Sequence, residues 1–243
     1  MTHATTGPTS ASLLGPRRLV LLRHGRTAWN LIGRAQGHTD VTLDETGRDQ
    51  AAAAAPYLAG YDPVALWSSD LARARETAAY VEKATGLEAV TDPRLREFDV
   101  GQRSGLTVAE FGERFPEAHA AWAAGHVTGG VPGAETIDDV TARMVPALRE
   151  MLASLGPGET GVVVAHGACI KVSLMALLGL PARSEEAIFV MDNCGWVPTT
   201  RRRIPASCPR WGPPISHRTP RVASIPRVVT PVSGEAMGLW RSW

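Results

Sequence analysis

The sequence predicts an α/β fold, a three-layer α/β/α sandwich in which helices cover both faces of a mostly parallel central sheet. Two short apolar runs, Leu19–Leu22 and Val162–Ala165, are each followed by a stretch compatible with a helix. Such runs are typical of strands buried on both faces of a parallel sheet. His24 and His166, each directly before a glycine, follow the two runs. Ligands of open α/β sheets bind beyond the carboxyl ends of the strands, so we expect both histidines in one site.

Helices and strands alternate along the rest of the chain. In order, we expect a helix over 44–59, a strand over 66–68, a helix ending at 83, a strand over 87–90, a helical lid-like region over 108–124, and helices over 136–155 and 169–178. Pro56 should kink or end the first helix. Ser69 or Asp70 could cap the second, with Gly86 ending it, which places Arg73 in the first turn. A phosphate there would meet free backbone N–H groups.

Composition and charge divide the chain into three parts. We expect a flexible leader over 1–16, one α/β domain over 17–197 and an atypical Arg/Pro-rich tail over 198–243. The tail has eight arginines and one acid, a net +7, which leaves −6 for the rest of a chain of net charge +1. We interpret the tail as disordered or as the product of a shifted reading frame, with an edge strand missing or poorly formed. An RNA-binding tail is the alternative, although regular aromatic interleaving is absent from its sequence.

Several classes of protein are disfavoured. A net charge of +1 gives no indication of a nucleic-acid partner. The three cysteines have no paired spacing, so neither a disulfide framework nor a zinc site is expected. The sequence has no apolar run near the roughly eighteen residues of a membrane span, and no secretory pattern at its start. We therefore expect a cytoplasmic protein without a membrane partner.

Four blocks of the sequence carry histidine or charged residues of the kinds found in active sites. They read LRHGRTAWN at 22–30, SSDLARARETA at 68–78, LREFDVG at 95–101 and VVAHG at 163–167. In this order they resemble the signature blocks of the histidine phosphatase superfamily, the phosphoglycerate-mutase-like proteins. The stretch GRAQG at 33–37 continues the pattern, and the match spans roughly residues 17–197. The resemblance implies a phosphoglycerate mutase-like fold, chemistry through a phosphohistidine, and no metal or other cofactor.

These residue types suit phosphoryl transfer. We expect His24 to be the nucleophile, because a neutral imidazole can accept and release a phosphoryl group near pH 7. Arg23, Arg73 and His166 should surround the phosphoryl oxygens, since fixed cations and donors in a dry site stabilise the charge on the transferring group. The planar arginine fork matches phosphate oxygens. The cations also oppose protonation of His24.

The remaining candidates serve proton transfer or substrate binding. Glu97 could protonate the leaving alkoxide and later deprotonate water. A salt-bridging acid is its alternative role, and Asp99 is a nearby competitor. Substrate-binding candidates are Thr27, Asn30, Gln36 and Arg103, of which the first three are also types that cap helices and form turns. Arg103, like Arg26, could bind a substrate carboxylate or stay solvated. Glu135 is expected outside the site, as an acid at a helix start.

The resemblance leaves two reactions open. A phosphohistidine can pass its phosphoryl group to water, as in a phosphatase, or to another hydroxyl of a retained sugar acid, as in a mutase. Family mutases have a longer insertion after the acid-bearing block, whereas here only residues 101–107 precede the next helix. We therefore expect a metal-independent phosphatase acting on a small-molecule phosphomonoester, of the sugar phosphate or phosphoglycerate type. A cofactor-dependent phosphoglycerate mutase is the alternative, and an inactive phosphoryl-binding or interaction module is a third reading. The chain could form a homodimer.

Overall fold

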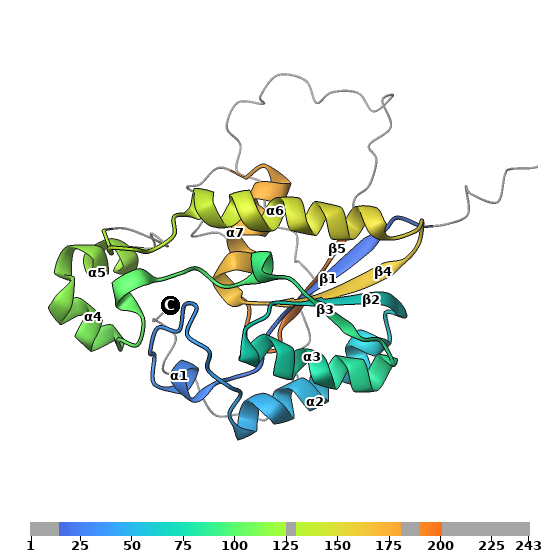
Figure 1. Ribbon diagram of the computed structural model, residues 1–243, viewed down its shortest axis with the longest axis horizontal. Helices are drawn as coiled ribbons and strands as arrows, with labels where there is room; N and C mark the ends of the chain where they lie inside the picture. Colours follow the sequence, from blue (N-terminus) through green and yellow to red (C-terminus); the bar gives the residue numbers. More distant parts are fainter. Residues whose placement is uncertain (1–14, 125–129, 181–189, 201–243) are drawn as a thin grey trace, which may run out of the picture. The chain divides into compact units, whose positions relative to one another are not determined.

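A five-stranded sheet lies at the centre of the fold (Figure 1). The structure is a computed structural model that describes residues 15–124, 130–180 and 190–200. The strands are β1 (Arg18–Arg23), β2 (Pro63–Ser68), β3 (Ala89–Thr91), β4 (Thr160–Ala165) and β5 (Trp196–Thr200), in the order β3-β2-β4-β1-β5. Every pairing is parallel except that of β1 with β5. The mostly parallel sheet confirms the predicted fold class.

Helices cover both faces of this sheet. The pair α2 (Glu45–Ala59) and α3 (Ala72–Thr85) lies on one face, and the pair α6 (Ile137–Ser154) and α7 (Gly167–Leu178) lies on the other (Figure 1). The short helices are α1 (Ala28–Leu31), α4 (Val108–Arg114) and α5 (Pro116–Ala123), with 3-10 turns η2 (Pro93–Leu95) and η3 (Gly101–Arg103). In Figure 1, α1, α4 and α5 lie on the side of the sheet where the parallel strands end.

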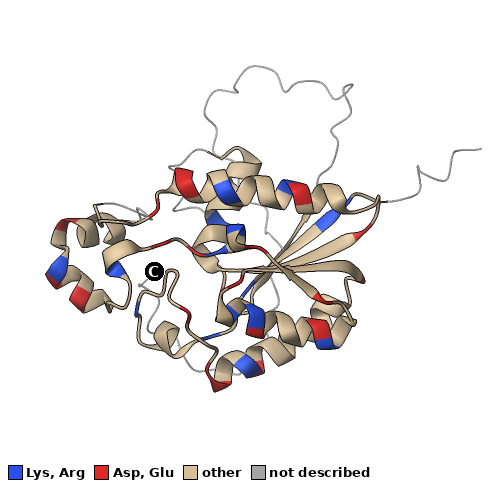
Figure 2. Ribbon diagram, viewed as in Figure 1, with Lys and Arg blue, Asp and Glu red and all other residues tan. Residues whose placement is uncertain are grey.

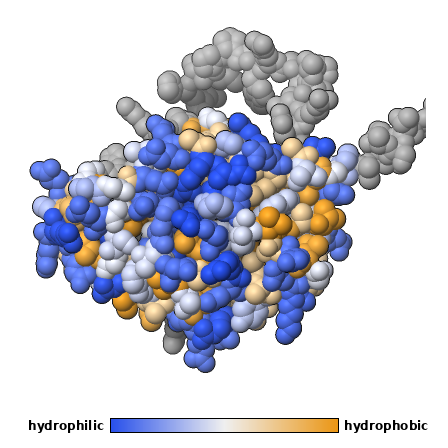
Figure 3. All heavy atoms as spheres, viewed as in Figure 1, coloured by the Kyte–Doolittle hydropathy of each residue, from blue (hydrophilic) through white to orange (hydrophobic). Residues whose placement is uncertain are grey.

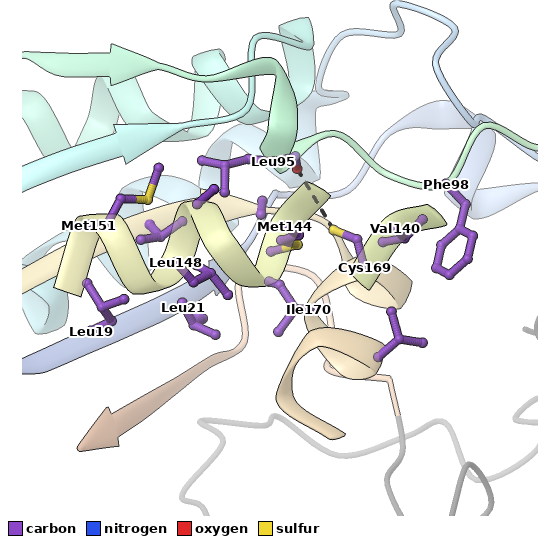
Figure 4. Packing of buried hydrophobic residues seen from close by; sticks show 14 of the residues in the cluster. Leu19, Leu21, Leu95, Phe98, Val140, Met144, Leu148, Met151, Cys169 and Ile170 are labelled. Carbon is purple, nitrogen blue, oxygen red and sulfur yellow. Dashed lines mark hydrogen bonds between the residues drawn. The ribbon is translucent and has the colours of Figure 1, made fainter. Parts of the chain in front are cut away.

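The alternation of side chains along β1 builds two cores. Leu19 and Leu21 pack with residues of α6 and α7 (Figure 4), whereas Val20 and Leu22 pack with residues of α2 and α3. Successive side chains of a strand point to opposite faces, so a strand between two helical layers must be apolar throughout. All six residues of β4 are buried for the same reason. The charged residues of both signs lie largely on the helices and loops (Figure 2), and hydrophilic residues predominate on the face seen in Figure 3.

Two prolines behave differently in the helices. Pro56 does not end α2, which continues to Ala59. Pro56 and Ala52 both lie on the exposed side of α2, so the Ala52 carbonyl that lacks an N–H donor can bind water. The helical region expected over 108–124 consists of two helices, α4 and α5. Phe115 ends α4, and Pro116 begins α5 at the first position, where the missing N–H costs no hydrogen bond.

The start of α3 also differs from the prediction. Neither Ser69 nor Asp70 caps it, because Leu71 occupies the cap position and makes no side-chain cap bond. The Oδ1 atom of Asp40 instead accepts the N–H of Ala72 at 2.5 Å, from a loop 32 residues earlier in the chain. Gly86 ends the helix in the left-handed conformation, as predicted. A carboxylate therefore already occupies part of the helix start that was expected to be free for phosphate.

The last described strand lies where a defective edge was expected. β5 pairs with β1 from Trp196, opposite Leu22, to Thr200, opposite Arg18. An edge strand is therefore present, and residues 198–200 belong to the sheet rather than to an atypical tail. Residues 201–243 and the leader up to residue 14 lie outside the described residues. Within residues 15–124, 130–180 and 190–200, no helix is both long enough and apolar enough to cross a bilayer.

Candidate active site

Two neighbouring strands bring the histidines together. His24 directly follows β1 and His166 directly follows β4, and these strands pair in parallel with Arg23 opposite Ala165. The centroids of the two imidazole rings lie 5.0 Å apart, with their planes inclined by 61°. Both side chains are buried. The two residues predicted to share a site thus face each other at the carboxyl ends of the central strands.

The protonation state of His24 follows from its hydrogen bond. Its Nδ1 lies 2.7 Å from the carbonyl oxygen of Gly25. A carbonyl only accepts, so Nδ1 carries the proton and Nε2 keeps its lone pair. Burial, with the charges of Arg73 and Arg23, lowers the pKa of His24 well below its ordinary value of 6.5. His24 is therefore neutral at pH 7, and its Nε2 makes no hydrogen bond to any described residue.

His166 has the opposite tautomer. The Nε–H of Arg73 donates to Nδ1 of His166 at 3.1 Å, so Nδ1 is unprotonated. Nε2 then carries the proton and donates to Oγ of Ser69 at 2.9 Å. Burial and the charge of Arg73 lower the pKa of His166 well below its ordinary value. Ser69, which the sequence suggested only as a helix cap, thus fixes a histidine of the site.

Arg73 lies in the first turn of α3, as predicted, and is almost completely buried. Besides its bond to His166, its guanidinium donates from Nη1 to the Thr39 carbonyl at 2.9 Å and from Nη2 to the Gly37 carbonyl at 2.8 Å. Burial lowers its pKa to about 10, so it remains charged at pH 7. Three bonds from three nitrogens hold this cation rigidly beside both histidines.

Arg23 has a buried donor without an acceptor. Nη1 donates to the Met191 carbonyl at 2.5 Å, but Nε is covered from solvent and has no hydrogen-bond partner among the described residues. A Cβ on Gly167 would come within 3.2 Å of this Nε and 2.5 Å of Val190 Cγ1, so the close approach requires glycine. A buried N–H without a partner is costly to the fold.

Glu97 is held against the start of α7. Its Oε1 accepts the N–H of Phe98 at 3.0 Å and of Cys169 at 2.9 Å, and its Oε2 accepts the N–H of Ala168 at 3.0 Å. Its charge raises the pKa of Arg23 and of Arg73, partly offsetting the effect of their burial. The carboxylate is therefore fixed close to both arginines. Its competitor Asp99 is half exposed and accepts the N–H of Gly101 within its own loop.

An ion pair that the sequence did not predict supports the Glu97 loop. Glu135 and Arg143 form two hydrogen bonds of 2.8 Å. Arg143 also donates to the carbonyls of Arg94, Arg96 and Glu97, at 2.9, 2.8 and 2.8 Å. Glu135 precedes the cap residue of α6, so it is not only an acid at a helix start. The available signal was Arg143 itself, a charged residue within the apolar spacing of that helix.

The substrate-binding candidates differ in how far the protein uses their polar atoms. Thr27 and Asn30 form a capping box at α1, in which the Thr27 hydroxyl both donates and accepts. The Nδ2 of Asn30 makes no hydrogen bond to a described residue. Gln36 is buried, and its Oε1 has no hydrogen-bond partner within the described part of the chain. A flip of its side-chain amide would place the NH2 group at that position instead of the oxygen. The Nε of Arg103 is likewise covered and unpartnered.

The described residues contain neither a cluster of metal-binding side chains nor a reactive thiol. Among them, no group of three or more His, Cys, Asp or Glu side chains could hold a metal ion. Cys169 and Cys194 are free and buried. Burial raises the pKa of the Cys169 thiol well above its ordinary value and that of Cys194 to about 12, so both are protonated at pH 7. The third cysteine, Cys208, lies outside the described residues.

Comparison with protein families agrees with this geometry. The family model of the histidine phosphatase superfamily (branch 1) matches residues 19–211. The chain belongs to the histidine phosphatase superfamily. The match includes both His-Gly pairs, both site arginines and Glu97.

Relatives within this superfamily include named phosphatases. The chain is 40% identical over 198 residues to glucosyl-3-phosphoglycerate phosphatase of Mycobacterium tuberculosis, covering 79% of this chain and 88% of the relative. It is 39% identical over 156 residues to a metal-independent phosphoserine phosphatase of Arabidopsis thaliana, covering 63% and 65%. The structure of mycobacterial glucosyl-3-phosphoglycerate phosphatase with VO3 superposes with a TM-score of 0.70 and 42% identity, over 75% of this chain and 92% of that one.

Proposed function

We propose that this histidine phosphatase hydrolyses small phosphorylated metabolites, without a metal, through a phosphohistidine at His24. The observation that carries the proposal is the neutral His24 with an unbonded Nε2, beside an Arg23 whose buried Nε lacks an acceptor. A neutral imidazole nitrogen is a nucleophile at pH 7, and the cations Arg23 and Arg73 beside it can stabilise the oxygens of the group it attacks. The relatives are named as phosphatases of small phosphate esters, which supports the same reaction class.

In the first step, Nε2 of His24 attacks phosphorus, forming a P–N bond while the bond to the leaving oxygen breaks. Arg23 and Arg73 balance the negative charge of the phosphoryl oxygens, and Nε2–H of His166 can donate to one of them when it leaves Ser69. A protonated Glu97 supplies the proton that the leaving alkoxide needs. Asn30 and Gln36 provide further polar contacts in this proposal, whereas the Thr27 hydroxyl is engaged in its cap.

In the second step, water attacks the phosphohistidine. Glu97, now a carboxylate, takes a proton from that water, the P–N bond breaks, and inorganic phosphate leaves with His24 restored. The N–H groups of Ala168 and Cys169 at the start of α7, with that of Phe98, keep the Glu97 carboxyl group in one place during both steps. A fixed position matters because proton transfer requires hydrogen-bond distance to the reacting oxygen.

Hydrolysis is favoured over mutase activity by the segment after Glu97. The chain passes through the single turn η3 and enters α4 at Val108, so residues 101–107 form a short connection rather than a long insertion. A mutase must keep water away from the phosphohistidine while its substrate turns over within the site. The short connection provides less cover for such a state, and we therefore assign the phosphoryl acceptor as water.

Phosphate release tests this proposal. The wild type and a His24→Ala variant are compared in excess EDTA with a panel of phosphomonoesters that includes p-nitrophenyl phosphate and 3-phosphoglycerate. His119→Ala, a half-buried histidine of α5, serves as the control, and circular dichroism establishes that each variant is folded. We expect release by the wild type and the control only. Interconversion of phosphoglycerates without release would identify a mutase, and no reaction at all would identify an inactive module.

A further inference from the structure

His38 joins two loops of the active site. It lies between Gly37, whose carbonyl accepts Nη2 of Arg73 at 2.8 Å, and Thr39, whose carbonyl accepts Nη1 at 2.9 Å. Its own Nε2 lies 2.8 Å from the backbone carbonyl oxygen of Glu97. A carbonyl only accepts, so Nε2 carries the proton and donates to Glu97. One imidazole therefore links the loop that holds the cation Arg73 to the residue proposed as the proton donor.

The two loops approach each other closely at this point. A Cβ on Gly37 would lie 2.7 Å from Cγ2 of Val100 and 3.4 Å from the Phe98 carbonyl oxygen. The φ of Gly37, +51°, lies in the left-handed region and also favours glycine. The backbone before His38 thus lies directly against the chain that follows Glu97. The hydrogen bond between these two residues therefore acts across packed backbone.

The Glu97 carbonyl has a second donor, on another element. Nη2 of Arg143, in α6, donates to it at 2.8 Å. On the His38 ring, Nδ1 lies 3.7 Å from Oδ2 of Asp99, and Nε2 lies 3.9 Å from Oε2 of Glu135. Asp99, the competitor of Glu97 in the sequence, therefore has its carboxylate near the imidazole that holds Glu97. The main chain of Glu97 is held both from α6 and from the loop that carries His38.

The hydrogen bonds of the Glu97 carboxyl group leave one restraint to be supplied. The N–H groups of Phe98 and of two residues at the start of α7 bind its oxygens. These bonds hold the carboxyl group against α7, but not against the loop that holds Arg73. Proton transfer requires hydrogen-bond distance, and a misplacement of about 1 Å can cost roughly 100-fold in rate. The bond from His38 restrains the acid relative to the arginine assigned to the phosphoryl oxygens.

We propose that His38 is a positioning residue for proton transfer, which holds Glu97 at the distance from the phosphoryl site at which the leaving oxygen receives its proton. This inference rests on the proposed phosphatase function. His38 itself touches neither the substrate nor the transferring group in this mechanism. Its contribution is largest for an ester with a basic leaving oxygen, because such an oxygen needs the proton as the P–O bond breaks. It is small for an acidic phenol, which leaves as an anion.

Aryl phosphates that differ in the acidity of their phenol test this role. The full-length protein is assayed with p-nitrophenyl phosphate, p-chlorophenyl phosphate and phenyl phosphate, which have similar shapes and leaving oxygens of increasing basicity. The quantity compared is kcat/KM. It includes the steps up to release of the phenol, so the later hydrolysis of the phosphohistidine does not enter.

Three variants separate positioning from general loosening of the loop. His38→Ala removes the donor to Glu97, and His38→Gln keeps an N–H donor on a side chain of similar reach. Ser104→Ala is the matched control. The Ser104 hydroxyl lies 2.7 Å from Oγ1 of Thr39 and donates to the Gln36 carbonyl at 3.4 Å, so it binds the same loop without contacting Glu97. Circular dichroism checks that each variant is folded.

We expect His38→Ala to lower kcat/KM for phenyl phosphate by roughly 10- to 100-fold, and for p-nitrophenyl phosphate by less than about 3-fold. His38→Gln should recover most of the loss, and Ser104→Ala should change all three substrates by the same factor. An equal loss for all three substrates in His38→Ala would overturn the proposal. The same selective loss in Ser104→Ala, or a loss in His38→Gln as large as in His38→Ala, would also overturn it.

A Glu97→Gln protein shows whether the effect passes through Glu97. Glu97→Gln should itself cause the selective loss, because an amide has no acidic proton to give. Adding His38→Ala should then lower kcat/KM for phenyl phosphate no more than for p-nitrophenyl phosphate. A further selective loss would assign the proton to His38 and overturn the positioning role. These outcomes are read with an active wild type, so they are distinguishable from failure of the proposed function, in which the wild type releases no phosphate and both proposals fall.

Discussion

At the residue scale, hydrogen-bond partners decide which nitrogen of each site histidine carries the proton. The Gly25 carbonyl places it on Nδ1 of His24, and the Arg73 guanidinium places it on Nε2 of His166. Burial and the neighbouring cations keep both rings neutral. One histidine is therefore arranged as a nucleophile and the other as a donor, although both follow a strand and precede a glycine.

The two neutral histidines predict how stability depends on pH. Their pKa values are lowered in the folded protein, so the unfolded chain binds more protons below the ordinary value of 6.5. Their contribution to stability is therefore present above about pH 6.5 and is lost as the pH falls below it, by up to about 1.4 kcal/mol per pH unit for each histidine.

Urea unfolding between pH 7.5 and pH 5 measures this effect. Replacing His166 by Gln should make the loss of stability with falling pH less steep than in the wild type. His119→Gln, outside the site, should keep the wild-type slope. A His166→Gln variant with an unchanged slope would show that this ring does not stay neutral in the folded protein.

At the scale of elements, the first turn of α2 sets the position of the loop after β1. A Cβ on Gly47 would lie 1.9 Å from the Arg26 carbonyl, and one on Gly25 would lie 2.4 Å from the Gly47 carbonyl. The two backbones are thus in direct contact. This contact holds the loop between His24 and the capping box of α1.

Gly47→Ala tests that contact. Alanine normally stabilises a helix by roughly 0.5–1 kcal/mol relative to glycine. Here we expect a loss of roughly 1–3 kcal/mol, because the added methyl group must displace backbone. Gly60→Ala is the matched control, since its φ is −63° and its new Cβ would lie 3.4 Å from the nearest carbonyl oxygen. Urea denaturation that shows the two variants equally stable would refute the close approach.

The sequence predicts the elements that depend on local pattern, but not the contacts between residues that are far apart in the chain. The two buried strands and the helix ending at Gly86 depend on local pattern, so they were predicted. The Asp40 cap of α3 and the Arg143 support of the Glu97 loop join residues far apart in the chain. Spacing within one sequence carries no signal for such contacts. The sequence predicts the five residues with catalytic roles in the proposal because each lies in a short block of distinctive residues. Local spacing predicts Ser69 only as a helix cap, although its hydroxyl accepts a hydrogen bond from His166.

For the whole molecule, β5 closes the edge of the sheet against the strand that carries Arg23. The Arg23 N–H donates to the Gly195 carbonyl at 3.0 Å, and the Asn193 side chain donates to the His24 carbonyl at 3.1 Å. The segment 193–200 therefore supports the position of the nucleophile directly. The proposed mechanism uses no residue beyond Thr200.

Two truncated chains test the contributions of β5 and of residues 201–243 separately. A chain ending at Thr200 should keep kcat/KM for p-nitrophenyl phosphate within a few-fold of the wild type. A chain ending at Gly195 removes β5 and exposes the edge of β1, so it should unfold at a lower temperature and lose activity. Loss of activity in the longer truncated chain, with its fold intact, would show that residues 201–243 contribute to the site.

The central claim for the whole molecule is that His24 carries the phosphoryl group between substrate and water. Rapid mixing with p-nitrophenyl phosphate, quenching in alkali and mass spectrometry of the peptides test it most directly, because phosphohistidine survives in base. We predict one added phosphoryl group on the peptide that contains His24, absent from the His24→Ala protein. Phosphate release by the wild type with the label on another residue, or with no labelled peptide under conditions that preserve phosphohistidine, would contradict the account.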